Sequence, residues 1–210
     1  VLMDEEPGSD EAYPRARLKS PGTPAVMHEQ MVFLPYNHSN ACELIRQHRD
    51  ELAVVLIEPA QGSNPRDDIG EFLSELREVT RECGVLLCFD EVITGGRLSL
   101  GGAQPFYGVY ADLATFGKAL GGGLPIGIIG GTPTVMQAVR GGTARDPRSI
   151  FMGGTFSGNP LSTATGMAVM SHLEQAGEEF YDSLETRSKR LRVQVTRYCS
   201  ERGIGARMLG

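Results

Sequence analysis

The sequence predicts an α/β fold with a mainly parallel sheet and helices on both of its faces. Two segments, 52–57 and 85–89, are continuously apolar, which is typical of strands buried on both faces. Between them, the apolar residues from Phe72 to Cys83 share one helical face, and Gly84 follows where a glycine commonly ends a helix. A helix that crosses between two buried strands indicates that the strands are parallel.

The other elements are expected in order along the chain. Residues 1–30 are rich in Pro, Glu, Arg and Ser without a helical or strand period, so we expect an irregular arm there. Capping residues and Pro at the first helical position mark the helix starts, and apolar runs mark the strands. We predict strands at 31–34, 113–116 and 126–129, and helices over 40–49 after Ser39, 133–139, 160–173 after Asn159 and about 178–199.

Composition bounds the class of protein. The chain has 210 residues, of which 40% are hydrophobic and 22% charged, and no apolar run is long enough to span a membrane. Acidic residues outnumber basic ones, 26 to 20, which argues against nucleic acid and membrane surfaces as partners. Glycine, 27 residues in clusters, marks tight loops between elements.

The four cysteines contain no C-x-x-C pair, so we expect reduced thiols in a cytoplasmic protein and no metal site. The first residues lack the basic start and apolar stretch of a signal peptide, and residue 1 is Val rather than Met. We interpret this start as that of a fragment or a processed piece.

Two carboxylates, Asp90 and Glu91, come directly after the apolar strand 85–89. In parallel α/β sheets, ligands bind at the carboxyl ends of the strands, which makes Asp90 a candidate binding residue. The alternative is that Asp90 only caps a turn, as acidic residues after strands often do.

Lys118 is the second candidate. The chain has only three lysines: Lys19 lies in the predicted arm and Lys189 on a charged helix face, whereas Lys118 follows an apolar strand and precedes a glycine-rich loop. We expect its amine to be partly buried there, which would make it a nucleophile towards an aldehyde. The alternatives are a phosphate-binding lysine or an ordinary surface lysine. A Walker P-loop is excluded because Ala119 stands where that motif has Ser or Thr.

A lysine that forms a Schiff base and a carboxylate that keeps a pyridine nitrogen protonated are the two protein groups that pyridoxal 5′-phosphate (PLP) requires. Lys118 and Asp90 together therefore point to PLP.

Four segments, 57–62, 89–95, 115–127 and 154–161, carry a family resemblance, reading Ile-Glu-Pro-Ala-Gln-Gly, Phe-Asp-Glu-Val-Ile-Thr-Gly, Thr-Phe-Gly-Lys-Ala-Leu-Gly-Gly-Gly-Leu-Pro-Ile-Gly and Gly-Thr-Phe-Ser-Gly-Asn-Pro-Leu. In type, order and spacing they resemble the class III PLP-dependent aminotransferases, most closely the glutamate-1-semialdehyde 2,1-aminomutase branch. The resemblance implies the large domain of PLP-dependent transferase fold type I, incomplete here. Residues 31–175 would be part of this PLP-binding domain, and 176–210 a connecting helix and the start of a small C-terminal domain.

The resemblance also implies roles for five residues. Lys118 would bind the cofactor covalently and carry a proton, Asp90 would pair with the pyridinium nitrogen, and Val92 would pack on the ring. Thr155 would bind the phosphate of the neighbouring subunit's cofactor, so a homodimer with a shared active site is implied. Glu58 would lie near the substrate, its alternative being a strand-end carboxylate that holds the following loop.

Some positions depart from the family. Ile93 replaces a Gln of the ω-amino acid branch, as in the aminomutase branch; Gly96 stands where many relatives have an aromatic residue; and Ser63 precedes Asn64 where the aminomutases have Asn at once. The family's upstream phosphate-binding segment and its aromatic-His-Gly segment do not occur in the chain. We therefore expect the middle of a protein about twice as long, inactive on its own.

The function expected is that of a PLP-dependent aminotransferase or aminomutase, moving an amino group on or between small amino acid and oxo-acid or semialdehyde substrates. Its partners would be small-molecule amino donors and acceptors. Two alternatives stay open: an aminotransferase domain of a multidomain peptide or polyketide synthase, and a non-catalytic fragment of such an enzyme.

Overall fold

Four strands form a single sheet in the computed structural model, which describes residues 22, 24, 26–139, 150, 152–206 and 208–209. The strands lie in sequence order: β1 (Val54–Ile57), β2 (Leu86–Asp90), β3 (Leu113–Gly117) and β4 (Gly127–Gly131). β1, β2 and β3 are parallel, and β4 runs antiparallel to β3. The predicted α/β class with a mainly parallel sheet and helices is confirmed.

The register of the sheet brings three strand ends together. Ile57 pairs with Phe89, and Asp90 pairs with Thr115. Because the three strands are parallel, the loops that leave β1, β2 and β3 all start at the same edge. β2 lies between the other two, so its last residue, Asp90, is in the middle of this edge.

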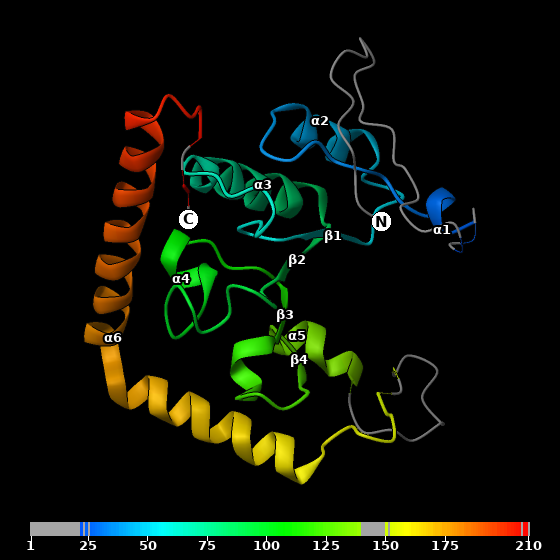
Figure 1. The fold of residues 1–210 in the computed structure, drawn as a ribbon. Coiled ribbons are helices and arrows are strands. Elements are labelled where there is room, and N and C mark those ends of the chain that lie inside the picture. The colour runs from blue at the N-terminus through cyan, green and yellow to red at the C-terminus, as the bar shows by residue number, and fades with distance from the viewer. Residues whose placement is uncertain are drawn as a thin grey trace.

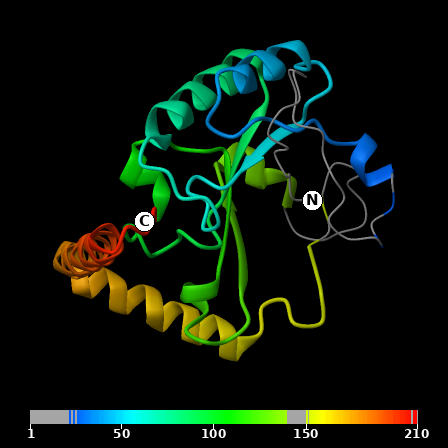
Figure 2. The same ribbon diagram turned by 45° about the horizontal axis from the view of Figure 1, so that its top comes forward.

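The core lies between the sheet and two helices, α2 (Asn40–Gln47) and α3 (Ile69–Cys83). Figure 2 shows these helices side by side over the sheet. The buried residues of α3 recur every three or four positions, as predicted, and they pack with every second residue of the strands. Gly84 ends α3 in the left-handed conformation with φ 69°, which confirms the predicted helix stop.

The remaining helices border the sheet edge and the chain ends. They are α1 (Val26–Glu29), α4 (Ala103–Tyr107), the 3₁₀ turn η1 (Lys118–Gly121), α5 (Pro133–Met136) with η2 (Gln137–Val139), and α6 (Pro160–Glu201). The predicted cap of α6 is confirmed, because Asn159 Oδ1 accepts from the N–H groups of Leu161 and Ser162 at 3.0 and 3.2 Å. α6 contains both predicted helices, bent at Gly177, and Figure 1 shows the bend.

Several predictions on the N-terminal part are corrected. Residues 31–34 form no strand: Leu34 and Tyr36 instead pack irregularly on the core. Helix α2 ends at Gln47 rather than residue 49, and Ser39 makes no side-chain cap bond. The N–H groups of Ala41 and Cys42, which such a cap would engage, donate to the backbone carbonyls of His38 and Ser39. Of the predicted irregular arm, residues 1–21, 23 and 25 lie outside the described residues, and Val26–Glu29 form the short helix α1 instead.

The expectation that strands are buried on both faces holds for β2 but is wrong for β1. Val54 and Leu56 are 41% and 65% exposed, whereas Val55 between them is buried. The described residues cover only the face of β1 towards α3. Within the described part of the chain, no helix is long and apolar enough to cross a membrane.

An ion pair between Arg77 on α3 and Asp112 ties the core together. Arg77 donates to both carboxylate oxygens of Asp112, at 2.6 and 3.2 Å, and the N–H of Leu87 in β2 donates to the carboxylate at 2.9 Å. Burial raises the pKa of Asp112, but the hydrogen bonds from Arg77 and Leu87 outweigh it, so this pKa lies below its ordinary value. Asp112 thus joins α3, β2 and the start of β3.

We expect Asp112→Asn to lower the free energy of unfolding by about 3 kcal/mol at pH 7, because the substitution leaves the Arg77 charge largely buried without its partner. Urea unfolding measures the change. The native Asp112 binds its proton less readily than the unfolded one does, so its contribution is present above about pH 4 and fades as the pH falls further. The difference between wild type and variant should therefore shrink below pH 4.

The matched control is Glu82→Gln, which breaks an exposed ion pair with Arg46 and should leave stability within experimental error of wild type. Equal effects of the two substitutions would contradict the structural role given to Asp112.

Candidate active site

Asp90 ends β2 with its carboxylate held by one oxygen. Its Oδ1 accepts from the N–H of Val92 and from Thr115 Oγ1, each at 3.1 Å. Among the described residues, no hydrogen bond uses Oδ2. The side chain is half-buried. Asp90 is therefore a turn cap, as the simpler interpretation has it, and also an oriented carboxylate with one oxygen available to a ligand.

Lys118 begins η1 directly after β3, with a backbone φ of 47°. This left-handed conformation is rare for a residue with a side chain. The expectation of a partly buried amine is wrong for the described residues, because Lys118 is exposed. Neither the sheet nor η1 covers its side chain, and no ion pair within the described ranges engages it. The amine is accessible at the sheet edge that carries Asp90.

Val92 and Ile93 lie in the loop that follows Asp90. Val92 is half-buried, and its Cγ1 lies so near Gly117 that a Cβ atom there would be 3.7 Å from it. Ile93 reaches the loop after β1, where a Cβ on Gly62 would lie 3.1 Å from its Cδ1. The loops after β1 and β2 and the residue before Lys118 thus meet at one place.

Glu58, the first residue after β1, is half-buried. Its backbone carbonyl accepts from the Tyr36 hydroxyl at 3.1 Å, and the Tyr36 ring lies 6.0 Å from that of Phe72 on α3. The loop after β1 is therefore held through the backbone of Glu58. In the described structure its carboxylate makes no hydrogen bond, so the alternative that this carboxylate holds the loop gains no support.

Thr155 lies in the exposed segment before α6. No contact described for this segment joins Thr155 to Asp90 or Lys118. Of the five residues singled out from the sequence, Glu58, Asp90, Val92 and Lys118 follow or border the same sheet edge, and Thr155 does not join them within one chain.

Sequence reasoning missed two residues behind this edge. Glu91 is completely buried, and Gln104 donates to its carboxylate at 3.0 Å. The signal for Glu91 was its position as a second acidic residue directly after a buried strand. A carboxylate that is buried there requires several hydrogen-bond donors. Nothing in the local sequence identifies Gln104 as one of them.

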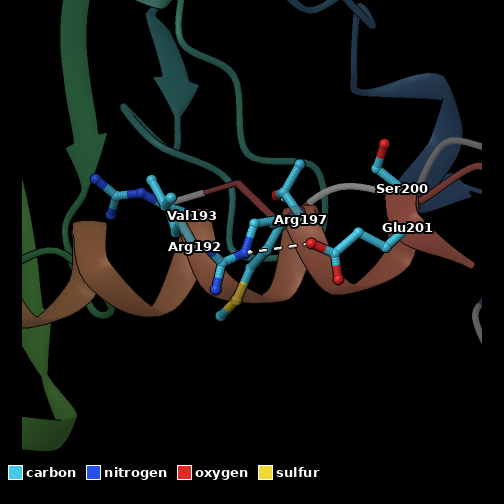
Figure 3. Close-up of a pocket in the computed structure, with 7 residues that line it drawn as sticks. Arg192, Val193, Arg197, Ser200 and Glu201 are labelled. Carbon is cyan, nitrogen blue, oxygen red and sulfur yellow. Dashed lines mark hydrogen bonds and ion pairs between the residues drawn. The ribbon is translucent and has the colours of Figure 1, made fainter.

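A surface hollow on the second half of α6 is remote from these residues. Figure 3 shows it lined by Arg192, Val193, Arg197 and Glu201, with Arg197 paired to Glu201 at 3.7 Å. Its charged groups are already paired with one another or with Glu185, so it offers no unpartnered chemistry. In the described residues, no group of three or more His, Cys, Asp or Glu side chains could hold a metal ion.

Comparison with known proteins identifies relatives. Residues 16–204 match the family described as Aminotransferase class-III. The chain is 39% identical over 191 residues to glutamate-1-semialdehyde 2,1-aminomutase of Methanosarcina acetivorans, covering 90% of this chain and 43% of that protein. It is 43% identical over 171 residues to the enzyme of the same name from Desulfotalea psychrophila, covering 80% and 38%. The chain thus spans less than half the length of these curated relatives.

Solved structures agree. An omega-transaminase from Sphaerobacter thermophilus superposes with a TM-score of 0.86 at 39% identity, covering 99% of this chain and 46% of that one. A transaminase with PLP bound superposes with a TM-score of 0.77 at 27% identity, covering 93% and 45%.

The contact between Tyr36 and Glu58 generates a prediction. Burial, with the nearby Tyr107, raises the pKa of Tyr36 above its ordinary value of 10.0. Above pH 10 the folded chain therefore keeps a proton that the unfolded chain releases, so stability falls as the pH rises. We expect Tyr36→Phe to cost about 1 kcal/mol at pH 7 for the lost hydrogen bond and to lose stability less steeply above pH 10.

Unfolding by urea at pH 7, 9 and 10.5 measures both effects. Tyr198→Phe removes an exposed hydroxyl and serves as the control that should keep the wild-type slope. An equal slope for Tyr36→Phe and wild type would count against the contact.

Proposed function

The chain belongs to the class-III aminotransferase family, and on this premise we propose that it acts as a PLP-dependent aminotransferase or aminomutase. The observation that carries the proposal is the position of Asp90 and Lys118 after adjacent parallel strands, which leaves a carboxylate oxygen and a primary amine available at the same edge. Pyridoxal 5′-phosphate is the cofactor that this pair suits.

The residues present fit that cofactor. Asp90 Oδ2 is available to a protonated ring nitrogen, while the Val92 N–H and the Thr115 hydroxyl orient the carboxylate through Oδ1. Val92 lies beside Gly117, where its methyl groups can pack on an aromatic ring. When bound, PLP would withdraw electrons from the substrate carbon that bears the amino group.

Each protein group then has a task. The Asp90 carboxylate keeps a proton on the ring nitrogen by offering it a negative charge. Lys118 Nζ would hold the cofactor through its aldehyde carbon, and as a free amine it would accept and return a proton at the reacting carbon of the substrate. Glu58, at the end of the neighbouring strand, would face the substrate side.

For substrates, we propose small amino acids and oxo or semialdehyde compounds. The curated relatives are aminomutases, and Ile93 resembles that branch, which supports movement of the amino group within one substrate. The similarity to an omega-transaminase supports transfer between two substrates instead. Isomerisation of one amino aldehyde without an added amino donor would distinguish the first from the second. A requirement for a carrier-bound substrate would favour the multidomain synthase.

We also propose a homodimer in which Thr155 serves the partner's site. Thr155 is exposed, and the neighbouring Phe156, Leu161 and Met167 are 82%, 67% and 66% exposed, an apolar surface suited to a second copy. The cytoplasmic location expected from the four cysteines, all free in the structure, is proposed with it.

The first test maps the lysine that binds PLP. We expect borohydride reduction in the presence of PLP to modify Lys118, because this residue is exposed and follows the strand that pairs with the one ending at Asp90, and we expect Lys118→Arg to lose this labelling. Mass spectrometry of the 210-residue chain, and of any longer gene product that contains it, identifies the site. Lys189→Arg is the control that keeps the labelling. Modification confined to Lys19 and Lys189, or none at all, would contradict the proposal and favour the non-catalytic alternative.

A second test mixes variants to detect a shared site. We expect Lys118→Arg and Thr155→Val each to label poorly, and a co-expressed mixture to recover labelling at Lys118. The reason is that one of the two sites in a mixed dimer then combines an intact Lys118 with the partner's intact Thr155. The control mixture, Lys118→Arg with Asp90→Asn, should not recover, because these residues lie on adjacent strands of one chain. Equal behaviour of the two mixtures would rule out sharing through Thr155.

A further inference from the structure

We propose that Glu91 and Gln104 form a buried polar clamp that positions Asp90 relative to the strand leading to Lys118, an inference that rests on the proposed function. The hydrogen bonds of the two side chains go to other residues than Asp90, Val92 and Lys118, so both act as positioning residues. The name clamp refers below to the side chains of Glu91 and Gln104 with their hydrogen-bond partners.

Glu91 is a completely buried carboxylate with a donor at each oxygen. Its Oε2 accepts from Thr94 Oγ1 at 3.0 Å and from the N–H of Ala103, and its Oε1 accepts from Gln104 Nε2 at 3.0 Å. Removing a carboxylate from water costs several kcal/mol unless hydrogen bonds replace its hydration. The pocket supplies these bonds, so Glu91 fits only with its present partners in place.

Gln104 extends the clamp to the next strand. While its amide NH₂ group donates to Glu91, its Oε1 accepts from the N–H of Ala111 at 3.0 Å, two residues before β3 begins. The end of β2 is thereby connected through two side chains to the start of β3. Residues 91 and 111 lie at opposite ends of the segment that connects β2 to β3. The hydrogen bonds of Gln104 therefore join residues that are far apart in the sequence.

The backbone of Glu91 connects the clamp to the candidate site. The N–H of Glu91 donates to the carbonyl of Thr115 at 2.9 Å, and the Thr115 hydroxyl donates to Asp90. Since successive side chains of a strand point to opposite faces, Asp90 lies on the other face from Glu91. The clamp thus supports the Asp90 carboxylate from behind, and Lys118 follows Thr115 by three residues.

The space around the carboxylate is filled. A Cβ atom on Gly102 would lie 2.1 Å from Glu91 Oε2, and Gly102 has φ 78°, so the loop approaches Glu91 as closely as a glycine permits. The close loop and the three donors together restrict the Glu91 side chain to one conformation. A shift of the loop after Asp90 would move Val92 as well, because Val92 precedes Thr94 in the same loop.

Exchanging the carboxylate and the amide between positions 91 and 104 tests the clamp. In Glu91→Gln, the new amide NH₂ group faces a group that also donates, so two hydrogen-bond donors meet and one buried hydrogen bond is lost. Gln104→Glu alone places two carboxylates together. In the double variant the amide at position 91 donates to the carboxylate at position 104, whose second oxygen still accepts from Ala111, so the hydrogen bonds are restored with the same total charge. Glu82→Gln is the matched control at an exposed carboxylate.

Two readouts are measured on each protein. Hydrogen exchange of the Ala103 and Ala111 amides reports the clamp without any cofactor, and the rate of borohydride-trapped PLP labelling at Lys118 reports positioning. We expect Glu91→Gln to speed exchange of the two amides about tenfold and to slow labelling at Lys118 about tenfold, the equivalent of one lost buried hydrogen bond, and the double variant to recover most of both effects. Thr94→Val, which removes one donor of three, should give a smaller loss and remains informative if Glu91→Gln does not fold.

Labelling at the wild-type rate in Glu91→Gln and Thr94→Val, with faster amide exchange, would overturn the positioning role and leave only a structural one. A double variant no better than Glu91→Gln would overturn the clamp itself. Failure of the proposed function is distinguishable from both, because it is seen as wild-type protein that takes no PLP at Lys118, whereas amide exchange still decides the clamp.

Discussion

The candidate site depends on the parallel pairing of β2 with β1 and β3. Parallel strands all end at the same edge, so the residues that follow them become neighbours although they are far apart in the sequence. The pairing of Ile57 with Phe89 and of Asp90 with Thr115 sets which residues meet. Asp90 is central because β2 is central, and its carboxylate is oriented by the Thr115 hydroxyl of the adjacent strand.

Two carboxylates stabilise this arrangement: the half-buried one of Asp112 at the opposite end of the strands, and the buried one of Glu91 behind Asp90. Asp112 accepts from Arg77 and from the backbone of Leu87, which holds α3 and β2 to the start of β3. Glu91 and Gln104 connect the end of β2 to the residue before Asp112. Both networks cost free energy to desolvate and are stable only with their partners bonded. Such networks favour one register of the strands over others, since a shift by one residue would break all of them together.

The sequence was sufficient to single out Asp90 and Lys118 as candidates, because both are chemical exceptions in apolar or glycine-rich surroundings. It misjudged the surroundings of Lys118: a local apolar strand does not tell whether another element covers the next residue, and none of the described residues covers it. Residues 31–34 were misjudged for a similar reason. An apolar run becomes a strand only beside a partner edge, and here Leu34 packs on the core instead while Met31 is exposed.

The sequence by itself determined the four strands of the sheet, the longer helices and their order. The helical period of α3, its stop at Gly84 and the cap at Asn159 are local properties, because each depends on residues within a few positions of one another. Only the tertiary structure decided which residues meet: that Gln104 bonds to Glu91, and that the Thr115 hydroxyl bonds to Asp90. Those contacts join residues far apart in sequence, and their partners are set by strand order and register, which no local pattern encodes.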